Sequence, residues 1–160
     1  MRASDYIGIS EKIRSKELKL QGELSEINGK ISLLYTRIDS LESELQILQM
    51  ELNAVLSETD ENGNVDMRAV GAIRSRMSAV HSRISSCQSE ISDNESEKKK
   101  VESELQSVET EKQSTLSEIQ SAATVKSQNI SKLAGGLSGD YASIGQNLQS
   151  AFQVSLGQLS

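Results

Sequence analysis

The residues best suited to bind a metal ion lie in one short polar segment. Residues 60–66 read Asp-Glu-Asn-Gly-Asn-Val-Asp, which supplies enough carboxylate and amide oxygens to suggest calcium. The segment lacks the regular acidic spacing and the closing glutamate of an EF-hand loop. Asn62-Gly63 is itself a strong turn signal, because both residues tolerate a positive φ. We therefore interpret the segment as a solvated turn and predict no metal site.

Two other side chains with catalytic or ligating chemistry stand alone. His81 is the only histidine and Cys87 the only cysteine. A catalytic or zinc-binding histidine needs ligands or partners close to it, and none has a matching spacing. A buried free cysteine usually behaves as a small hydrophobic residue; an intermolecular disulfide or a reactive thiol is the alternative. With no phosphate-binding loop and no nucleophile beside a base, we predict no enzymatic activity, no cofactor and no small-molecule substrate.

The elements that carry these residues follow one regular apolar pattern. Over residues 20–55 the apolar positions alternate strictly between steps of four and three, the heptad repeat of a coiled coil, and the repeat resumes over residues 70–108. The chain has no proline, so unusually long helices are permitted. We predict a helix at about residues 4–57, a turn at 58–66 and a second helix at about 67–134.

Three features modify the second helix. Asp66 is a natural N-cap for it. Asn94, Lys98 and Lys112, with Glu17 of the first helix, place polar groups on the apolar seam, which we interpret as a loosened, water-accessible end of the hairpin, the alternative being a dedicated partner site. The step of eleven residues from Leu105 to Leu116 predicts a stutter that locally unwinds the supercoil.

The flanking charges predict that the two helices pair antiparallel in one register. In the predicted register, the residue numbers of two core residues that face each other add up to 125, and those of two facing g positions add up to 127. Five of the six pairs of facing g positions then join opposite charges. These pairs are Glu51–Arg76, Glu44–Arg83, Arg37–Glu90, Lys30–Glu97, Lys16–Glu111 and the like-charged Glu23–Glu104. The same register places the midpoint of the hairpin between Asn62 and Gly63, where turn chemistry also places it.

This register leaves the second helix longer than the first. Residues 135–140, Gly-Gly-Leu-Ser-Gly-Asp, predict a flexible turn with Asp140 as an N-cap. The amphipathic stretch 141–160 is about as long as the segment left without a partner. We therefore expect an all-α fold in which a long antiparallel coiled-coil hairpin, residues 1–134, carries a short third helix, 141–160, folded back at its end.

Charge and hydropathy limit the classes of partner. The net charge of −6 argues against nucleic-acid binding, which requires a basic surface to neutralise phosphates. No apolar stretch approaches the roughly 20 residues that span a bilayer. Residues 1–10 lack the apolar region of a secretory signal. We expect a cytoplasmic protein, with export without a cleaved signal peptide left open.

The outward-facing positions carry small residues where coiled coils usually carry Glu or Lys. A compositional bias on a solvated face is one explanation. The other is that small side chains let a second helix approach closely, assisted by two large apolar residues at the neighbouring c positions. The partner-binding residues would then be Gly22, Gly29, Leu33, Ile47, Ser82, Ser89 and Ser96.

Two short motifs of the predicted first helix, Leu20-Gln21-Gly22 and residues 35–39, resemble motifs in proteins of bacterial type VII secretion. Leu20-Gln21-Gly22 fits an L-x-G tripeptide in the first helix, and residues 35–39, Tyr-Thr-Arg-Ile-Asp, match the Y-x-x-x-[DE] export pattern. A helical hairpin with these motifs resembles the Trp-x-Gly and LXG families. The turn has Asn62-Gly63 where the Trp-x-Gly family has its Trp motif, and the tyrosine motif lies in the first helix rather than the second. The resemblance implies a helical partner and a role as export substrate, targeting segment or adaptor.

Two functions fit these observations. The first is a coiled-coil interaction module that binds a helical protein. The second is a structural spacer or tether, or a self-assembling scaffold, in which the length of the hairpin is the function.

Overall fold

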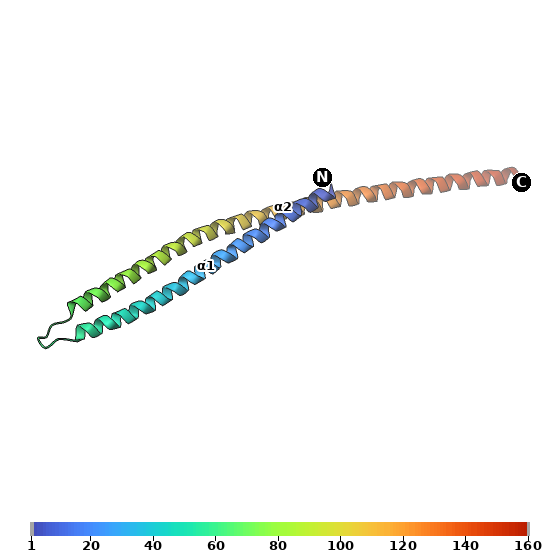
Figure 1. The fold of residues 1–160 in the computed structure, drawn as a ribbon. Coiled ribbons are helices and arrows are strands. Elements are labelled where there is room, and N and C mark those ends of the chain that lie inside the picture. Colours follow the sequence, from blue (N-terminus) through green and yellow to red (C-terminus); the bar gives the residue numbers. More distant parts are fainter. Residues whose placement is uncertain (1, 160) are drawn as a thin grey trace. The chain divides into compact units, whose positions relative to one another are not determined.

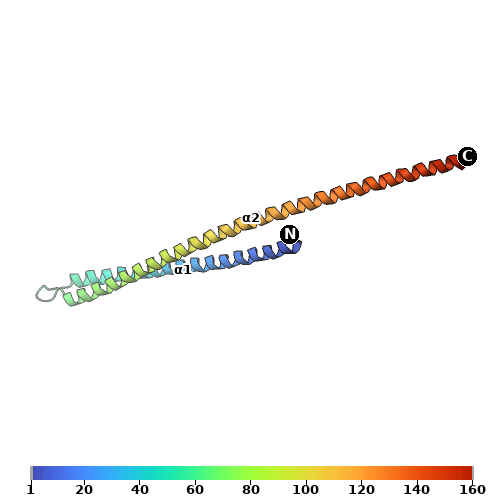
Figure 2. The same ribbon diagram turned by 90° about the horizontal axis from the view of Figure 1, so that it is seen from above.

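A computed structural model describes residues 2–159, apart from the side chains of residues 149 and 151–159. The described chain is all-helical and consists of α1, Ala3–Ser57, and α2, Met67–Leu159 (Figures 1 and 2). It divides into two compact units. We call residues 11–109 the hairpin unit, and residues 2–10 together with 110–159 the terminal unit.

In the hairpin unit α1 and α2 pack against each other along the predicted apolar seam, and they lie side by side in both ribbon views. Every buried side chain of the described residues is apolar and occupies a predicted heptad position. The buried residues of α1 are Ile13, Leu20, Ile27, Leu34, Ile38, Leu41, Leu48 and Leu52. Those of α2 are Val70, Ile73, Val80, Ile84, Cys87, Ile91, Val101 and Val108. The core is therefore a single layer between two helices.

The turn is organised by two aspartates. Oδ1 of Asp60 accepts hydrogen bonds from the backbone N–H groups of Asn62 and Asn64, both at 2.8 Å. Gly63 has φ of 78°, the one positive φ among the described residues. Oδ1 of Asp66 accepts from the N–H groups of Arg68 and Ala69, both at 3.1 Å, so Asp66 caps α2 as its residue type predicts.

Two of the predicted interhelical charge pairs are ion pairs in the structure. Arg76 Nη1 lies 3.2 Å from Glu51 Oε2, and Arg83 Nη1 lies 3.5 Å from Glu44 Oε2. Both pairs lie near the turn and identify the register, since neither is compatible with a shift of one heptad. Lys30 differs from its prediction, because its ammonium contacts Glu26 of its own helix at 2.8 Å rather than Glu97.

The predicted stutter is wrong. In the terminal unit Thr115, Ile119 and Ala122 of α2 are partly buried, as are Tyr6 and Ile9 of α1. These α2 positions continue the unbroken heptad from Val108, and Leu116 is 45% exposed. A helix held in phase over many preceding turns keeps that phase, although a larger apolar side chain lies one residue further on.

The predicted break at residues 135–140 is also corrected. α2 runs without interruption through Gly135, Gly136 and Gly139 to Leu159, so the structure does not show a separate third helix over 141–160. Each interior glycine costs a helix only about 1 kcal/mol relative to alanine. An established helix propagates across such positions when no proline interrupts its hydrogen bonds.

Candidate protein-binding surfaces

Two glycines of α1 lie on an uncovered part of the hairpin unit. Gly22 and Gly29 are exposed, and a Cβ added at either position would meet no atom within 4 Å. Neither glycine has a positive φ. No packing or backbone constraint within the described chain therefore requires glycine at these positions, although each one weakens the helix.

Two large apolar side chains lie on the same side of α1 as these glycines. Leu33 is 73% exposed and Ile47 is 53% exposed. Both occupy position c, which is next to position f on the helix surface and turned away from the α1–α2 seam. We call Gly22, Gly29, Leu33 and Ile47 the α1 outer face. Its combination of open backbone and exposed aliphatic carbon is suited to contact with another helix.

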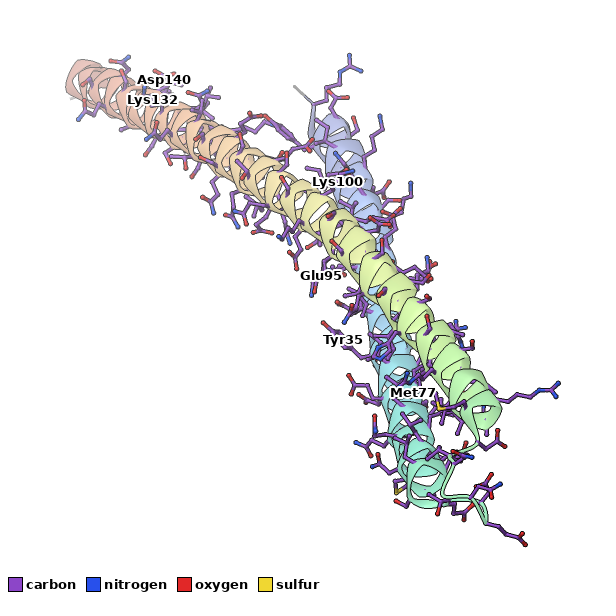
Figure 3. All side chains as sticks on the ribbon, turned by 90° about the vertical axis from the view of Figure 1, so that its left-hand side faces the viewer. Tyr35, Met77, Glu95, Lys100, Lys132 and Asp140 are labelled. Atoms are coloured by element: carbon purple, nitrogen blue, oxygen red, sulfur yellow. The ribbon has the colours of Figure 1, made fainter. Side chains whose placement is uncertain are left out.

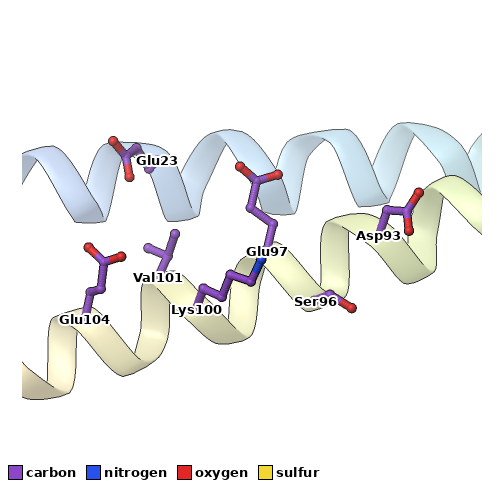
Figure 4. A pocket seen from close by; sticks show the side chains of 7 residues that line it. All are labelled: Glu23, Asp93, Ser96, Glu97, Lys100, Val101 and Glu104. Carbon is purple, nitrogen blue, oxygen red and sulfur yellow. The ribbon is translucent and has the colours of Figure 1, made fainter.

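The serines of α2 are exposed as well. Ser82, Ser89 and Ser96 repeat at seven residues and define what we call the α2 serine face. The Ser96 hydroxyl donates a hydrogen bond to the carbonyl of Ser92 in the preceding turn at 2.9 Å. That hydroxyl is therefore already engaged within α2. Figure 4 shows Glu97 extending toward α1, while the neighbouring Ser96 does not.

The structure does not gather the seven predicted residues into one surface. In a two-stranded coiled coil the f position of each helix points away from the partner helix, so the two f faces lie on opposite sides. The α1 outer face and the α2 serine face are therefore separate candidates. A single partner helix can contact one of them at a time.

The exposed apolar residues of the hairpin unit favour α1 over α2 as the helix that binds a partner. Leu18 and Met50 are 59% and 63% exposed and occupy outward-facing positions of α1 that the sequence interpretation did not include. Met50 continues the f series of Gly22 and Gly29, and it is one turn from Ile47. Following that series three heptads beyond Gly29 would have identified it. On α2 the large exposed apolar side chain of this unit is Met67, at the first helical position.

A shallow groove between the helices is lined by charged residues (Figure 4). Its lining residues are Glu23, Asp93, Ser96, Glu97, Lys100, Val101 and Glu104. Glu23 and Glu104 are the like-charged pair that the register predicts, and both border this groove. In the part of the chain that the structure describes, no group of His, Cys, Asp or Glu is arranged to hold a metal ion.

The remaining candidate residues lie apart from one another. His81 is exposed on α2, and Cys87 is a free, buried cysteine within the seam, 2% exposed. In the polar loop, the carboxylates of Asp60 and Asp66 accept backbone hydrogen bonds that shape the turn and cap α2. The structure thus gives each of these side chains a local structural role or a solvent-facing position.

One exposed ion pair perturbs titration. A hydrogen bond from Lys30, followed by the Lys30 charge, lowers the pKa of Glu26. The same hydrogen bond and charge raise the pKa of Lys30, with a smaller contribution from Glu97 across the seam. The pair within α1 is therefore the main cause of both shifts.

No protein-family model, curated protein or solved structure is significantly similar to this chain. Within the described residues, no helix is both long and apolar enough to cross a membrane.

Proposed function

We propose that the protein is a non-enzymatic coiled-coil module that binds a helical protein partner through the α1 outer face. The observation that carries this proposal is the juxtaposition of Gly22 and Gly29, which have open space around them, with exposed Leu33 and Ile47. Burying a large aliphatic side chain contributes about 1.5–3 kcal/mol. Glycine permits the backbone of a second helix to approach closely.

The stability of α1 alone does not explain why Gly22 and Gly29 are glycines. Glycine at an exposed interior position costs roughly 1 kcal/mol relative to alanine, and the α1–α2 seam gains nothing from Gly22 or Gly29, which do not contact it. An external helix that packs over the same positions gives both the glycines and their aliphatic neighbours a role. The partner is accordingly expected to present large side chains opposite the glycines.

The resemblance to type VII secretion proteins supports a narrower form of this proposal, in which the module is an export substrate, targeting segment or adaptor. Tyr35, the first residue of the Y-x-x-x-[DE] match, is 51% exposed on α1, and Asp39 is exposed one turn later. Export from a Gram-positive host with an active type VII system should then depend on Tyr35. Export that is unaffected by Tyr35→Ala would remove this narrower form and leave the binding module intact.

Site-specific photocrosslinking in cells tests the binding proposal. A benzoylphenylalanine placed at Leu33 should give a discrete adduct with a helical protein, and the same probe at Ser89 should not. Gly22→Glu should abolish the Leu33 adduct, because a charged side chain then occupies the approach path. Gly22→Ala, which adds one methyl group, should weaken it only in part. Circular dichroism must show unchanged helicity in both variants.

The alternative function is that of a structural spacer or tether, or of a self-assembling scaffold. α1 alone, with 55 residues, is about 80 Å long at 1.5 Å per residue. A spacer tolerates charge on its outer surface. Two results together would favour this alternative over the binding module. The Gly22→Glu variant would retain full biological activity, and the probe at Leu33 would give no adduct in the otherwise unchanged protein.

A further inference from the structure

The terminal unit contains an apolar surface that α1 does not cover. From residue 123 to residue 148 every described side chain is exposed. Six of them are large apolar or aromatic residues on one side of α2, and we call this set the terminal stripe. It consists of Ile130 (66% exposed), Leu133 (67%), Leu137 (55%), Tyr141 (73%), Ile144 (55%) and Leu148 (67%).

The terminal stripe continues the surface of α2 that is partly buried nearer the start of its segment of the terminal unit. Ile119 and Ala122, the last partly buried positions of the seam, lie eleven residues before Ile130 and Leu133. The eleven-residue interval recurs within the stripe, from Ile130 to Tyr141 and from Leu137 to Leu148. An eleven-residue repeat keeps apolar residues on one side of a nearly straight helix. One continuous face of α2 is therefore covered up to Ala122 and uncovered beyond it.

The helix around this stripe is weak by itself. Gly135, Gly136, Gly139 and Gly145 are all helical, and each has open space where a Cβ would stand. Glycine is the least favourable helix residue apart from proline. Helices in water obtain most of their stability from packing of an apolar face. An occupant on the terminal stripe would therefore add packing stability to a segment that is helical here but has a low helix propensity.

The distribution of charge indicates which occupant fits. After Lys132 the sequence contains one charged residue, Asp140, so the other charged side chains of a chain of net charge −6 all lie in residues 1–132. Figure 3 labels Lys132 and Asp140 on α2. Nothing in this segment attracts a charged partner or an anionic surface. A second, equally uncharged apolar helix meets no electrostatic penalty, and antiparallel pairing carries the two charged parts of α2 in opposite directions.

The spacing of the stripe is also self-complementary. About Leu137 five of the six apolar positions read the same in both directions, with Leu133 and Tyr141 at four residues and Ile130 and Ile144 at seven, whereas the mirror position of Leu148 is Lys126. A two-fold axis between antiparallel helices requires such a pattern, because each residue meets its mirror position on the other copy. In this register Asp140 lies opposite Ala134 rather than opposite a second Asp140.

We propose that the terminal stripe is a homodimer interface, in which residues 130–144 of two copies pair antiparallel about Leu137 and Leu148 lies beyond this central pairing. This inference goes beyond the proposed function, because it uses a different surface and names a different partner. Failure of one therefore leaves the other standing.

Sedimentation equilibrium of the full chain tests the proposal. The parent protein, of 17.4 kDa, should approach twice that mass between about 1 and 200 µM, a range that covers micromolar affinities. The double variant Leu137→Lys/Ile144→Lys should remain monomeric. Gln146→Lys, a matched charge on the opposite side of α2, should dimerise like the parent. A parent that is monomeric throughout, or a dimer that survives the double substitution, would overturn the proposal and leave another protein or a lipid surface as the occupant.

Spin labels determine the orientation. Thr124 is exposed on α2, and Thr124→Cys in a Cys87→Ala background gives one label per chain. Antiparallel pairing about Leu137 places the two labels about 40 Å apart along the axis, at 1.5 Å per residue. Parallel pairing brings them within about 20 Å, given a helix separation of about 10 Å. A short distance would contradict the antiparallel two-fold arrangement.

Discussion

Gly63 and Gly22 differ in whether the backbone requires glycine. Gly63 adopts φ of 78° at the turn, where a Cβ costs about 1–2 kcal/mol. Gly22 lies in the interior of α1 with open space around it, where alanine favours the helix by about 1 kcal/mol. We predict that Gly63→Ala lowers the free energy of unfolding by about 1–2 kcal/mol and that Gly22→Ala raises it by about 1 kcal/mol.

Urea denaturation of the two variants measures both effects under identical conditions. Gly63→Asn is the control for backbone conformation, because asparagine tolerates the left-handed region, and it should cost less than Gly63→Ala. Equal losses for the alanine and asparagine variants would mean that the turn relaxes to a different conformation.

The Glu26–Lys30 pair makes a prediction about pH. Lys30 lowers the pKa of Glu26 in the folded chain, so the pair stabilises α1 above the ordinary glutamate pKa. That contribution is lost as the pH falls through the lowered folded value. The raised pKa of Lys30 acts in the opposite range: its contribution is present below the ordinary lysine pKa and is lost as the pH rises through the raised value.

Carboxyl NMR titration checks this assignment. Lys30→Gln should return the pKa of Glu26 toward its ordinary value, and high salt should reduce the original shift because both groups are exposed. Glu97→Gln should leave the pKa of Glu26 nearly unchanged, since Glu97 contributes weakly and only to Lys30. A shift that survives Lys30→Gln would point to another cause.

At the scale of the helices, burial alternates between adjacent residues of α1. Leu48 is 0% exposed at the seam, while Ile47 is 53% exposed on the outer face. Because core truncation removes buried surface and leaves a cavity, Leu48→Ala should cost about 2–5 kcal/mol. Ile47→Ala should change stability by no more than about 0.5 kcal/mol. Thermal or urea unfolding of this adjacent pair compares seam with surface at nearly constant helix propensity, and similar losses would contradict the assigned register.

Several features of the two helices could be predicted from the sequence. The heptad positions, the turn at Asn62-Gly63 and the Asp66 cap follow from local patterns, and the structure has all three. The ion pairs formed in two of the predicted positions, Glu51–Arg76 and Glu44–Arg83. Lys30 pairs with Glu26 instead of Glu97, because Lys30 reaches a partner on its own helix without any movement of α2.

Two predictions failed because they treated a local signal as decisive. Leu116 suggested a stutter, but the seam retains its heptad phase and buries part of Thr115. The glycines of residues 135–140 suggested a break, but helix propagation across them is inexpensive compared with starting a new helix. The candidate binding residues stay a prediction, and the f positions of the two helices divide them between two separate faces.

For the molecule as a whole, Cys87 is a built-in reporter of hairpin opening. Its thiol is 2% exposed within the seam, and the chain contains no other cysteine. A thiol reagent should therefore react slowly with the native protein and rapidly with the unfolded one. If the seam opens cooperatively, Leu48→Ala should accelerate labelling by at least about 30-fold, the factor that corresponds to 2 kcal/mol. A rate that Leu48→Ala leaves unchanged would mean that Cys87 is reached by local fraying.

The single-layer core of the hairpin unit has a mechanical consequence. Residues 11 and 109 both lie at the end of the hairpin unit away from the turn, because α1 and α2 run antiparallel on either side of Gly63. Tension applied to these two residues loads the apolar layers one after another, from Ile13 toward Leu52, rather than all together. The hairpin should unzip at low force in many small extensions and re-zip as the load is released, which makes it a compliant element rather than a rigid strut.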